Sequence, residues 1–150
     1  MITLATPADT HDFGRRLGAL LRAGDLIVLA GPLGAGKTAL VQGIGAGMGV
    51  SGRIASPTFV IARVHPGAPP LVHVDAYRLG SLEEVDDLDL DVSADEAVTV
   101  VEWGTGVAER LSDARLDVVL TRLPESEVRT AQLVPVGGDW AQRIAPLLAP

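Results

Sequence analysis

The sequence lacks cysteine, has few aromatic residues and contains more acidic than basic residues. The absence of cysteine excludes disulfide bonds and metal sites built from thiolates. Aromatic residues make up 3% and hydrophobic residues 47%, so the core must consist of Val, Leu, Ile and Ala. This composition is typical of a buried parallel sheet covered by helices. At 150 residues we expect a single domain, 1–150, with a core large enough to fold without cross-links.

Long apolar runs and basic stripes are also missing. No uninterrupted apolar run reaches the length needed to cross a bilayer, and the first residues lack the basic and apolar regions of a signal peptide. The net charge is −7. Because direct contact with nucleic-acid phosphates needs clustered basic residues, we expect a cytoplasmic protein that does not bind membranes and meets RNA only through a partner.

Hydrophobic periodicity predicts an alternation of helices and strands. Thr6, Pro7 and Asp9 form a helix start with Thr6 as the N-cap residue, and the apolar spacing continues to about Ala23. The other expected elements are an edge strand at 2–5, buried strands at 25–30 and 98–101, hairpins at 58–64 with 71–75 and at 116–123 with 128–136, a short helix at 106–111 and a final helix capped by Asp139.

The segment between the strand at 25–30 and the next helix matches the P-loop signature Gly31-x-x-x-x-Gly36-Lys37-Thr38. The glycines let backbone N–H groups turn toward phosphate oxygens, and the helix N-terminus adds its positive dipole end. Lys37 would reach the β and γ phosphates, and the Thr38 hydroxyl would bind Mg²⁺. Lys37 is the only lysine among 12 Lys and Arg residues, which fits a site that needs a slim point charge. The alternative is a glycine-rich turn with an exposed lysine.

The P-loop predicts the cofactors and the fold. The cofactors would be ATP and Mg²⁺, because no Asn-Lys-x-Asp-like guanine-recognition motif is present. The expected fold is a P-loop NTPase-like α/β three-layer sandwich, whose mixed sheet has a parallel core and antiparallel hairpins. The predicted nucleotide-binding residues of the loop are Leu33, Gly34, Ala35, Gly36, Lys37, Thr38 and Ala39.

The helix after the P-loop carries many glycines. Gly43, Gly45, Gly47 and Gly49 alternate through it, and each costs about 1 kcal/mol relative to alanine inside a helix. The helix therefore either ends early or is held by close packing on the sheet.

Two carboxylates at strand ends are candidate catalytic residues beside Lys37. Asp75 ends the apolar run 71–74, where a Walker B acid holds Mg²⁺ directly or through water; otherwise it caps the following turn. Glu102 follows the strand at 98–101, at the end where parallel strands open toward a nucleotide. It either ligates Mg²⁺, orients the attacking water, or is an ordinary carboxylate at a strand end.

Three further features of the sequence give weaker indications of function. The segment from Ser56 to Thr58 is either a switch-like loop near the γ-phosphate or a turn started by proline. The acidic stretch 83–91 is either a solvated face or a docking surface for a basic partner. The histidines show no metal-ligand spacing, and we expect them to be structural or exposed: His11, His65 and His73.

Four sequence blocks occur in a fixed order along nearly the whole chain. They are Gly34-Ala35-Gly36-Lys37-Thr38, Ser56-Pro57-Thr58-Phe59, His73-Val74-Asp75-Ala76-Tyr77-Arg78-Leu79 and Val101-Glu102-Trp103. In this order they resemble the bacterial tRNA threonylcarbamoyladenosine biosynthesis ATPases of the TsaE (YjeE) family. The P-loop block is generic, whereas the other three make the match specific.

The resemblance implies a small ATPase with weak, partner-stimulated hydrolysis that supports formation of tRNA N6-threonylcarbamoyladenosine. Its partners would be TsaB and TsaD, the two other subunits of the threonylcarbamoyl-transfer complex, and tRNA would be contacted only indirectly. Carried over by motif, Thr38 and Glu102 would be Mg²⁺ ligands and Asp75 would be essential near the metal. The resemblance further implies that Trp103 lies near the nucleotide, that Ser56 and Thr58 belong to a mobile loop, and that Thr10 lies near the base.

Two other functions use the same P-loop. A small-molecule kinase would need an arginine-bearing lid, and no clear lid segment stands between 104 and 136. A nucleotide-dependent binding switch without useful catalysis would use ATP only to control docking. Phosphate release with water as the sole acceptor would separate the ATPase from the kinase, and hydrolysis with partners present would separate it from the switch.

Overall fold

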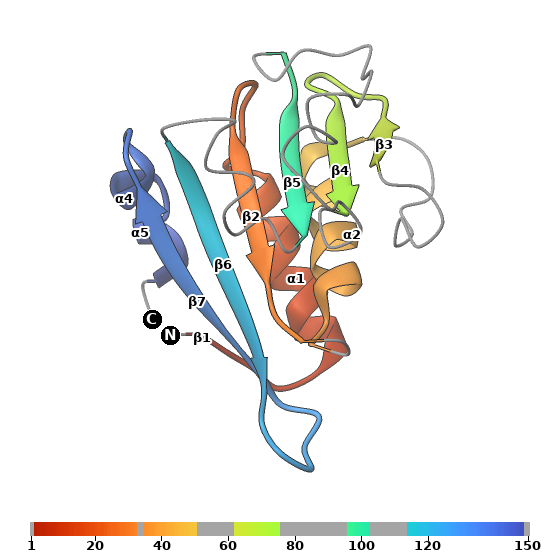
Figure 1. The fold of residues 1–150 in the computed structure, drawn as a ribbon, viewed down its shortest axis with the longest axis vertical. Coiled ribbons are helices and arrows are strands. Elements are labelled where there is room, and N and C mark those ends of the chain that lie inside the picture. The colour runs from red at the N-terminus through yellow and green to blue at the C-terminus, as the bar shows by residue number, and fades with distance from the viewer. Residues whose placement is uncertain (1, 33–34, 51–61, 76–95, 103–113, 149–150) are drawn as a thin grey trace.

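A computed structural model describes residues 2–32, 35–50, 62–75, 96–102 and 114–148. Its seven-stranded sheet carries helices packed against it (Figure 1). The strands are β1 (Ile2–Leu4), β2 (Leu26–Ala30), β3 (Ala62–His65), β4 (Leu71–Asp75), β5 (Val98–Glu102), β6 (Arg115–Arg122) and β7 (Arg129–Val136). The helices are α1 (Pro7–Gly18), α2 (Lys37–Met48), α4 (Trp140–Arg143) and α5 (Ala145–Leu148). No helix in these ranges combines the length and apolar character that crossing a bilayer requires.

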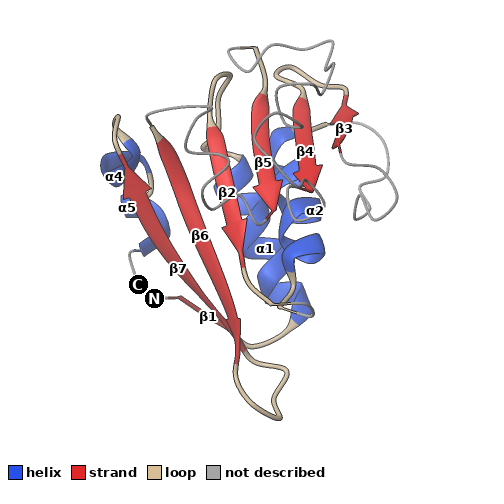
Figure 2. Cartoon of the chain, viewed as in Figure 1, coloured by secondary structure: helices blue, strands red, loops and turns tan. Residues whose placement is uncertain are grey.

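The sheet has the order β1-β7-β6-β2-β5-β4-β3, and its centre is parallel (Figure 2). Strand β2 pairs in parallel with both β5 and β6, and β4 pairs in parallel with β5. Strands β3 and β4 form one antiparallel pair, and β6 and β7 another, with β1 antiparallel at the edge beside β7. The predicted mixed sheet is therefore confirmed. The expected strand residues 58–61 and the expected helix 106–111 lie outside the described residues.

Both faces of the parallel centre are buried. On one face, alternate strand side chains such as Ile27, Leu29 and Val100 join a single apolar cluster with side chains of the helices. On the opposite face, Val28 and Val74 are also buried. Because a strand places successive side chains on opposite faces, this burial requires cover on both sides of the sheet. That requirement agrees with the expected three-layer arrangement.

Helix α1 begins as the sequence predicts but ends earlier. The Thr6 hydroxyl accepts a bond from the Asp9 amide at 3.1 Å, and the Asp9 carboxylate accepts one from the Thr6 amide at 3.1 Å, which completes a capping box. The expected continuation to Ala23 is wrong, because α1 ends at Gly18. Beyond it the Leu20 carbonyl accepts a bond from the Arg143 guanidinium at 2.8 Å, a long-range contact that local periodicity does not reveal.

The C-terminal helices are attached through ion pairs. The expected cap by Asp139 is wrong: it occupies the N-cap position of α4 but makes no capping bond, because its carboxylate accepts a bond from Arg22. Arg143 donates to Asp25 at 2.9 Å at the start of β2, and both side chains are nearly buried. Since removing one member of a buried pair leaves an uncompensated charge, this contact holds α4 to the turn between α1 and β2.

The glycines of α2 serve its contact with α1. The helix does not end early: it runs to Met48 and is capped by Gly49 in the left-handed conformation. A Cβ atom on Gly43 would come 2.1 Å from the His11 carbonyl oxygen, and one on Gly47 would come 2.1 Å from the Arg15 carbonyl oxygen. These positions are four residues apart and lie on one helix face. The close packing expected against the sheet is therefore packing against helix α1.

We expect Gly43→Ala to lower the free energy of unfolding by about 2 kcal/mol or more, measured by urea denaturation. Alanine is the better helix former by about 1 kcal/mol, but its methyl group would overlap the backbone of α1. The exposed neighbour Ala46 offers the control, because Ala46→Gly should cost only about 1 kcal/mol through helix propensity. An unchanged or higher stability of Gly43→Ala would contradict the assigned contact.

The buried His65 on β3 predicts a specific pH dependence. Burial, and next the electrostatic influence of His73 and Arg63, hold the pKa of His65 below its ordinary 6.5. The unfolded chain therefore binds this proton at a higher pH than the folded chain, so stability is lost as the pH falls through 6.5. As the pH is lowered from about 8 to about 5.5, the free energy of unfolding of the wild type should fall more than that of His65→Gln, as measured by denaturant unfolding. If the free energies of unfolding of the two proteins changed equally with pH, this prediction would be contradicted.

Candidate functional site

Helix α2 begins directly after the glycine-rich loop, and the residues at its N-terminus are half-buried. Gly36 takes the left-handed conformation at φ 99° and is the N-cap residue, and no side chain of the described residues caps the helix. Thr38 and Ala39 follow in the first turn, and both are half-buried. Because the amides of a first helical turn have no partners within the helix, such an end offers N–H donors and a positive dipole to an anion.

Lys37 closes the loop that precedes α2. Its Nζ donates a hydrogen bond to the carbonyl oxygen of Gly31 at 2.9 Å, so the side chain folds back over the start of the loop. Ala35 is fully buried inside the same turn. Gly31 has no room for a side chain, because a Cβ there would lie 2.7 Å from the Leu120 carbonyl oxygen on β6. The ammonium group of Lys37 is thereby held beside the Gly31 carbonyl oxygen at the start of the loop.

Strand pairing brings both candidate carboxylate positions to the edge where the loop begins. Leu29 of β2 is in register with Glu102 of β5, and Glu102 is in register with Asp75 of β4. The three parallel strands thus end side by side (Figure 1). Glu102 is the last residue of its strand rather than the residue after it, and it is only 5% exposed. The register therefore places Glu102 and Asp75 at the same end of the sheet as the start of the loop, while their roles stay predictions.

Thr10 on α1 lies against the same loop. It is buried, and its hydroxyl donates to the Thr6 carbonyl oxygen at 3.4 Å. Its methyl group would be the nearest neighbour of a Cβ built on Gly36, at 3.6 Å. The expected role of Thr10 near a base stays a prediction. The other predicted site residues, Leu33, Gly34, Ser56, Thr58 and Trp103, lie outside the described residues, as does the acidic stretch 83–91.

His73 lies beside Glu102, a neighbour that the sequence analysis did not predict. Its side chain is fully buried on β4, and its Nε2 lies 3.6 Å from Oε2 of Glu102. Among the described residues neither ring nitrogen has a hydrogen-bond partner. The signal was available: His73 precedes Asp75 by two, and residues two apart on a strand share a face. A search for metal-ligand spacing among the histidines does not reveal this carboxylate neighbour.

The residues at this edge suit a hard cation with oxygen ligands. Glu102 is a buried carboxylate, and among the described residues no Arg or Lys pairs with it. A buried carboxylate is costly unless a cation or several donors compensate it. The described ranges contain no group of three or more His, Asp or Glu residues that could hold a metal ion, and the side chain of Asp75 is not among those described. Carboxylate and hydroxyl oxygens, such as those of Glu102 and Thr38, are ligands typical of Mg²⁺.

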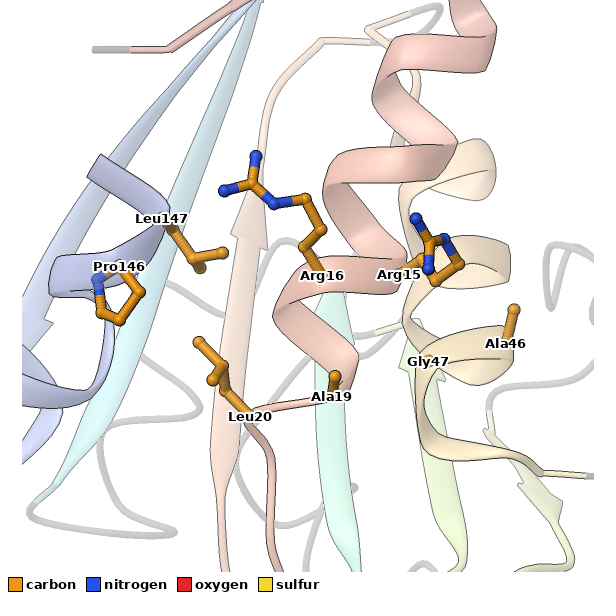
Figure 3. A pocket seen from close by; sticks show the side chains of 8 residues that line it. All are labelled: Arg15, Arg16, Ala19, Leu20, Ala46, Gly47, Pro146 and Leu147. Atoms are coloured by element: carbon orange, nitrogen blue, oxygen red, sulfur yellow. The ribbon is translucent and has the colours of Figure 1, made fainter. Parts of the chain in front are cut away.

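A separate surface groove lies near the other end of the helices. It has a volume of about 430 Å³ and is lined by Arg15, Arg16, Ala19, Leu20, Ala46, Gly47, Pro146 and Leu147 (Figure 3). These residues come from the C-terminal half of α1 and the two residues after it, from the C-terminal half of α2 and from α5, whereas the P-loop precedes the first turn of α2. The groove therefore does not belong to the candidate site.

Comparison with known proteins identifies the family. The sequence profile of the family described as "Threonylcarbamoyl adenosine biosynthesis protein TsaE" matches residues 4–131. The chain belongs to the TsaE family. The matched range contains every residue discussed above for the site, from Thr10 to Trp103. The resemblance drawn from the four sequence blocks is thus confirmed.

Individual TsaE relatives cover most of the chain. The Streptomyces coelicolor protein named tRNA threonylcarbamoyladenosine biosynthesis protein TsaE is 54% identical over 146 residues, which is 93% of this chain and 99% of that protein. The Bacillus subtilis TsaE is 36% identical over 123 residues, covering 81% of this chain and 77% of that protein. The crystal structure of Bacillus subtilis YdiB superposes with a TM-score of 0.78 at 27% identity, covering 97% and 91% of the two chains. The expected α/β fold is confirmed by this likeness and by the mixed sheet.

Proposed function

We propose that this TsaE family protein binds Mg·ATP at the carboxyl ends of β2, β5 and β4 and hydrolyses it slowly. Hydrolysis would serve the formation of tRNA N6-threonylcarbamoyladenosine in the cytoplasm. The observation that carries the proposal is Lys37, held at the start of the loop by its 2.9 Å bond to the Gly31 carbonyl oxygen, beside an N-terminus of α2 that no described side chain caps. Helix amides, a single ammonium group and a neighbouring buried carboxylate form the set of groups that a magnesium-bound triphosphate requires.

Each group of the chain has a defined part in this scheme. The amides of the first turn of α2 would donate to phosphate oxygens, and Lys37 would exchange its bond to Gly31 for the β and γ oxygens. Thr38 and Glu102 would hold Mg²⁺, with Asp75 beside them directly or through water. The bound ion would supply positive charge to the triphosphate as charge develops during transfer. Glu102 or Asp75 would also orient the attacking water.

Partners and charge extend the proposal. TsaB and TsaD, the other subunits of the threonylcarbamoyl-transfer complex, would bind this protein and accelerate its hydrolysis. The chain would meet tRNA only indirectly, because its net charge of −7 opposes direct contact with phosphates. Phosphate release from ATP with water as the only acceptor, measured with and without the partners, tests the activity. Transfer to a small molecule, or no release with every partner, would overturn it.

We expect Lys37→Ala to weaken ATP binding about 100-fold, because it removes the ammonium group aimed at the phosphates. Isothermal titration with ATP and Mg²⁺ measures this, and circular dichroism shows that the fold is retained. The matched control is Arg16→Ala on the remote groove, which should bind as the wild type does. An unchanged affinity of Lys37→Ala would contradict the assignment.

We expect Glu102→Gln to bind ATP without Mg²⁺ as the wild type does, but to slow partner-stimulated phosphate release about 100-fold. The neutral amide keeps the shape of the carboxylate and loses the charge that holds the metal. A phosphate-release assay with the partners present measures the effect. Normal stimulated turnover would remove Glu102 from the proposed metal site.

A further inference from the structure

The burial of His73 is unusual for a side chain with two polar nitrogens. It is fully buried on β4, and no hydrogen bond reaches Nδ1 or Nε2 from any described residue. Leaving a buried donor or acceptor unpaired costs about 1–3 kcal/mol, so an apolar side chain of similar size would pack there at lower cost. A histidine at this position therefore points to a task beyond packing.

Its nearest polar neighbour indicates the task. Nε2 of His73 lies 3.6 Å from Oε2 of Glu102, just beyond hydrogen-bond distance, so a small rotation of either side chain would close the bond. The register places His73 opposite Val100 and Glu102 opposite Asp75, so the imidazole approaches the carboxylate from the adjacent strand. His73 is 0% exposed and Glu102 7% exposed along their side chains, so Glu102 lies closer to solvent.

We propose that His73 is a positioning residue for Glu102, and this inference rests on the proposed magnesium–nucleotide site. The neutral imidazole donates Nε2–H to Oε2, which fixes the plane of the carboxylate and leaves Oε1 free to face the metal. Carboxylates that bind metals are commonly held in this way by a second group, and loss of that group costs about 10–100-fold in metal affinity. Because the His73 side chain is fully buried beside Glu102, it would act through the carboxylate rather than touch the ion.

The test titrates a fluorescent ATP analogue into the protein at a series of Mg²⁺ concentrations. The quantity compared is the Mg²⁺ concentration at which half of the magnesium-dependent gain in nucleotide affinity is reached. His73→Phe keeps a ring of similar size and removes the donor, so the required Mg²⁺ concentration should rise about 10–100-fold. Affinity without Mg²⁺ should be retained, and the melting temperature should not fall. His73→Gln places an amide N–H near the position of Nε2 and should restore most of the response.

The second buried histidine provides a matched control. His65 is 6% exposed, its Nε2 also lacks a partner among the described residues, and it lies on β3. His65→Phe should therefore leave the Mg²⁺ requirement unchanged. An increase in His65→Phe equal to that in His73→Phe would overturn the inference, because the effect would then follow from any change in this hairpin.

The remaining outcomes separate this inference from the proposed function. If the wild type shows no response of nucleotide affinity to Mg²⁺, both the magnesium site and the role of His73 are overturned. If the wild type responds and His73→Phe responds equally, only the role of His73 is overturned. Should His73→Phe not fold, the comparison of His73→Asn with His73→Gln decides: Asn is too short to reach Oε2, so only Asn should raise the requirement.

Discussion

The parallel pairing of β2, β5 and β4 is the constraint on which the candidate site depends. The register sets Leu29, Glu102 and Asp75 side by side, although they are far apart in the sequence. Parallel strands end at the same edge of a sheet, so this pairing brings the loop after β2 to both carboxylate positions. The apolar runs that make these strands buried therefore also determine where the polar groups meet.

The contact between α1 and α2 is the second structural condition. Glycine at positions 43 and 47 lets the two backbones approach at distances that no side chain would allow. The same approach sets Thr10 of α1 beside Gly36 at the start of α2. A helix rich in glycine loses stability as an isolated segment, but here that loss is offset by packing that supports the loop.

Much of the fold could be predicted because its signals are local. The capping box at Thr6, the P-loop and the alternation of the strands all depend on residues within a few positions of one another. The predictions that were wrong involve distant partners. Helix α1 ends before Ala23 where Arg143 binds the Leu20 carbonyl oxygen, and Asp139 pairs with Arg22 instead of capping its helix. Side-chain chemistry alone does not choose between a near and a distant partner.

The sequence by itself determined the P-loop motif and the family, because a short motif and ordered blocks carry both. Only the tertiary structure decided that His73 lies 3.6 Å from Glu102 and that Gly43 and Gly47 of α2 face α1. These relations depend on the register between strands and the crossing of two helices. Local periodicity predicts neither the strand register nor the helix crossing, since both arise when distant segments pack together.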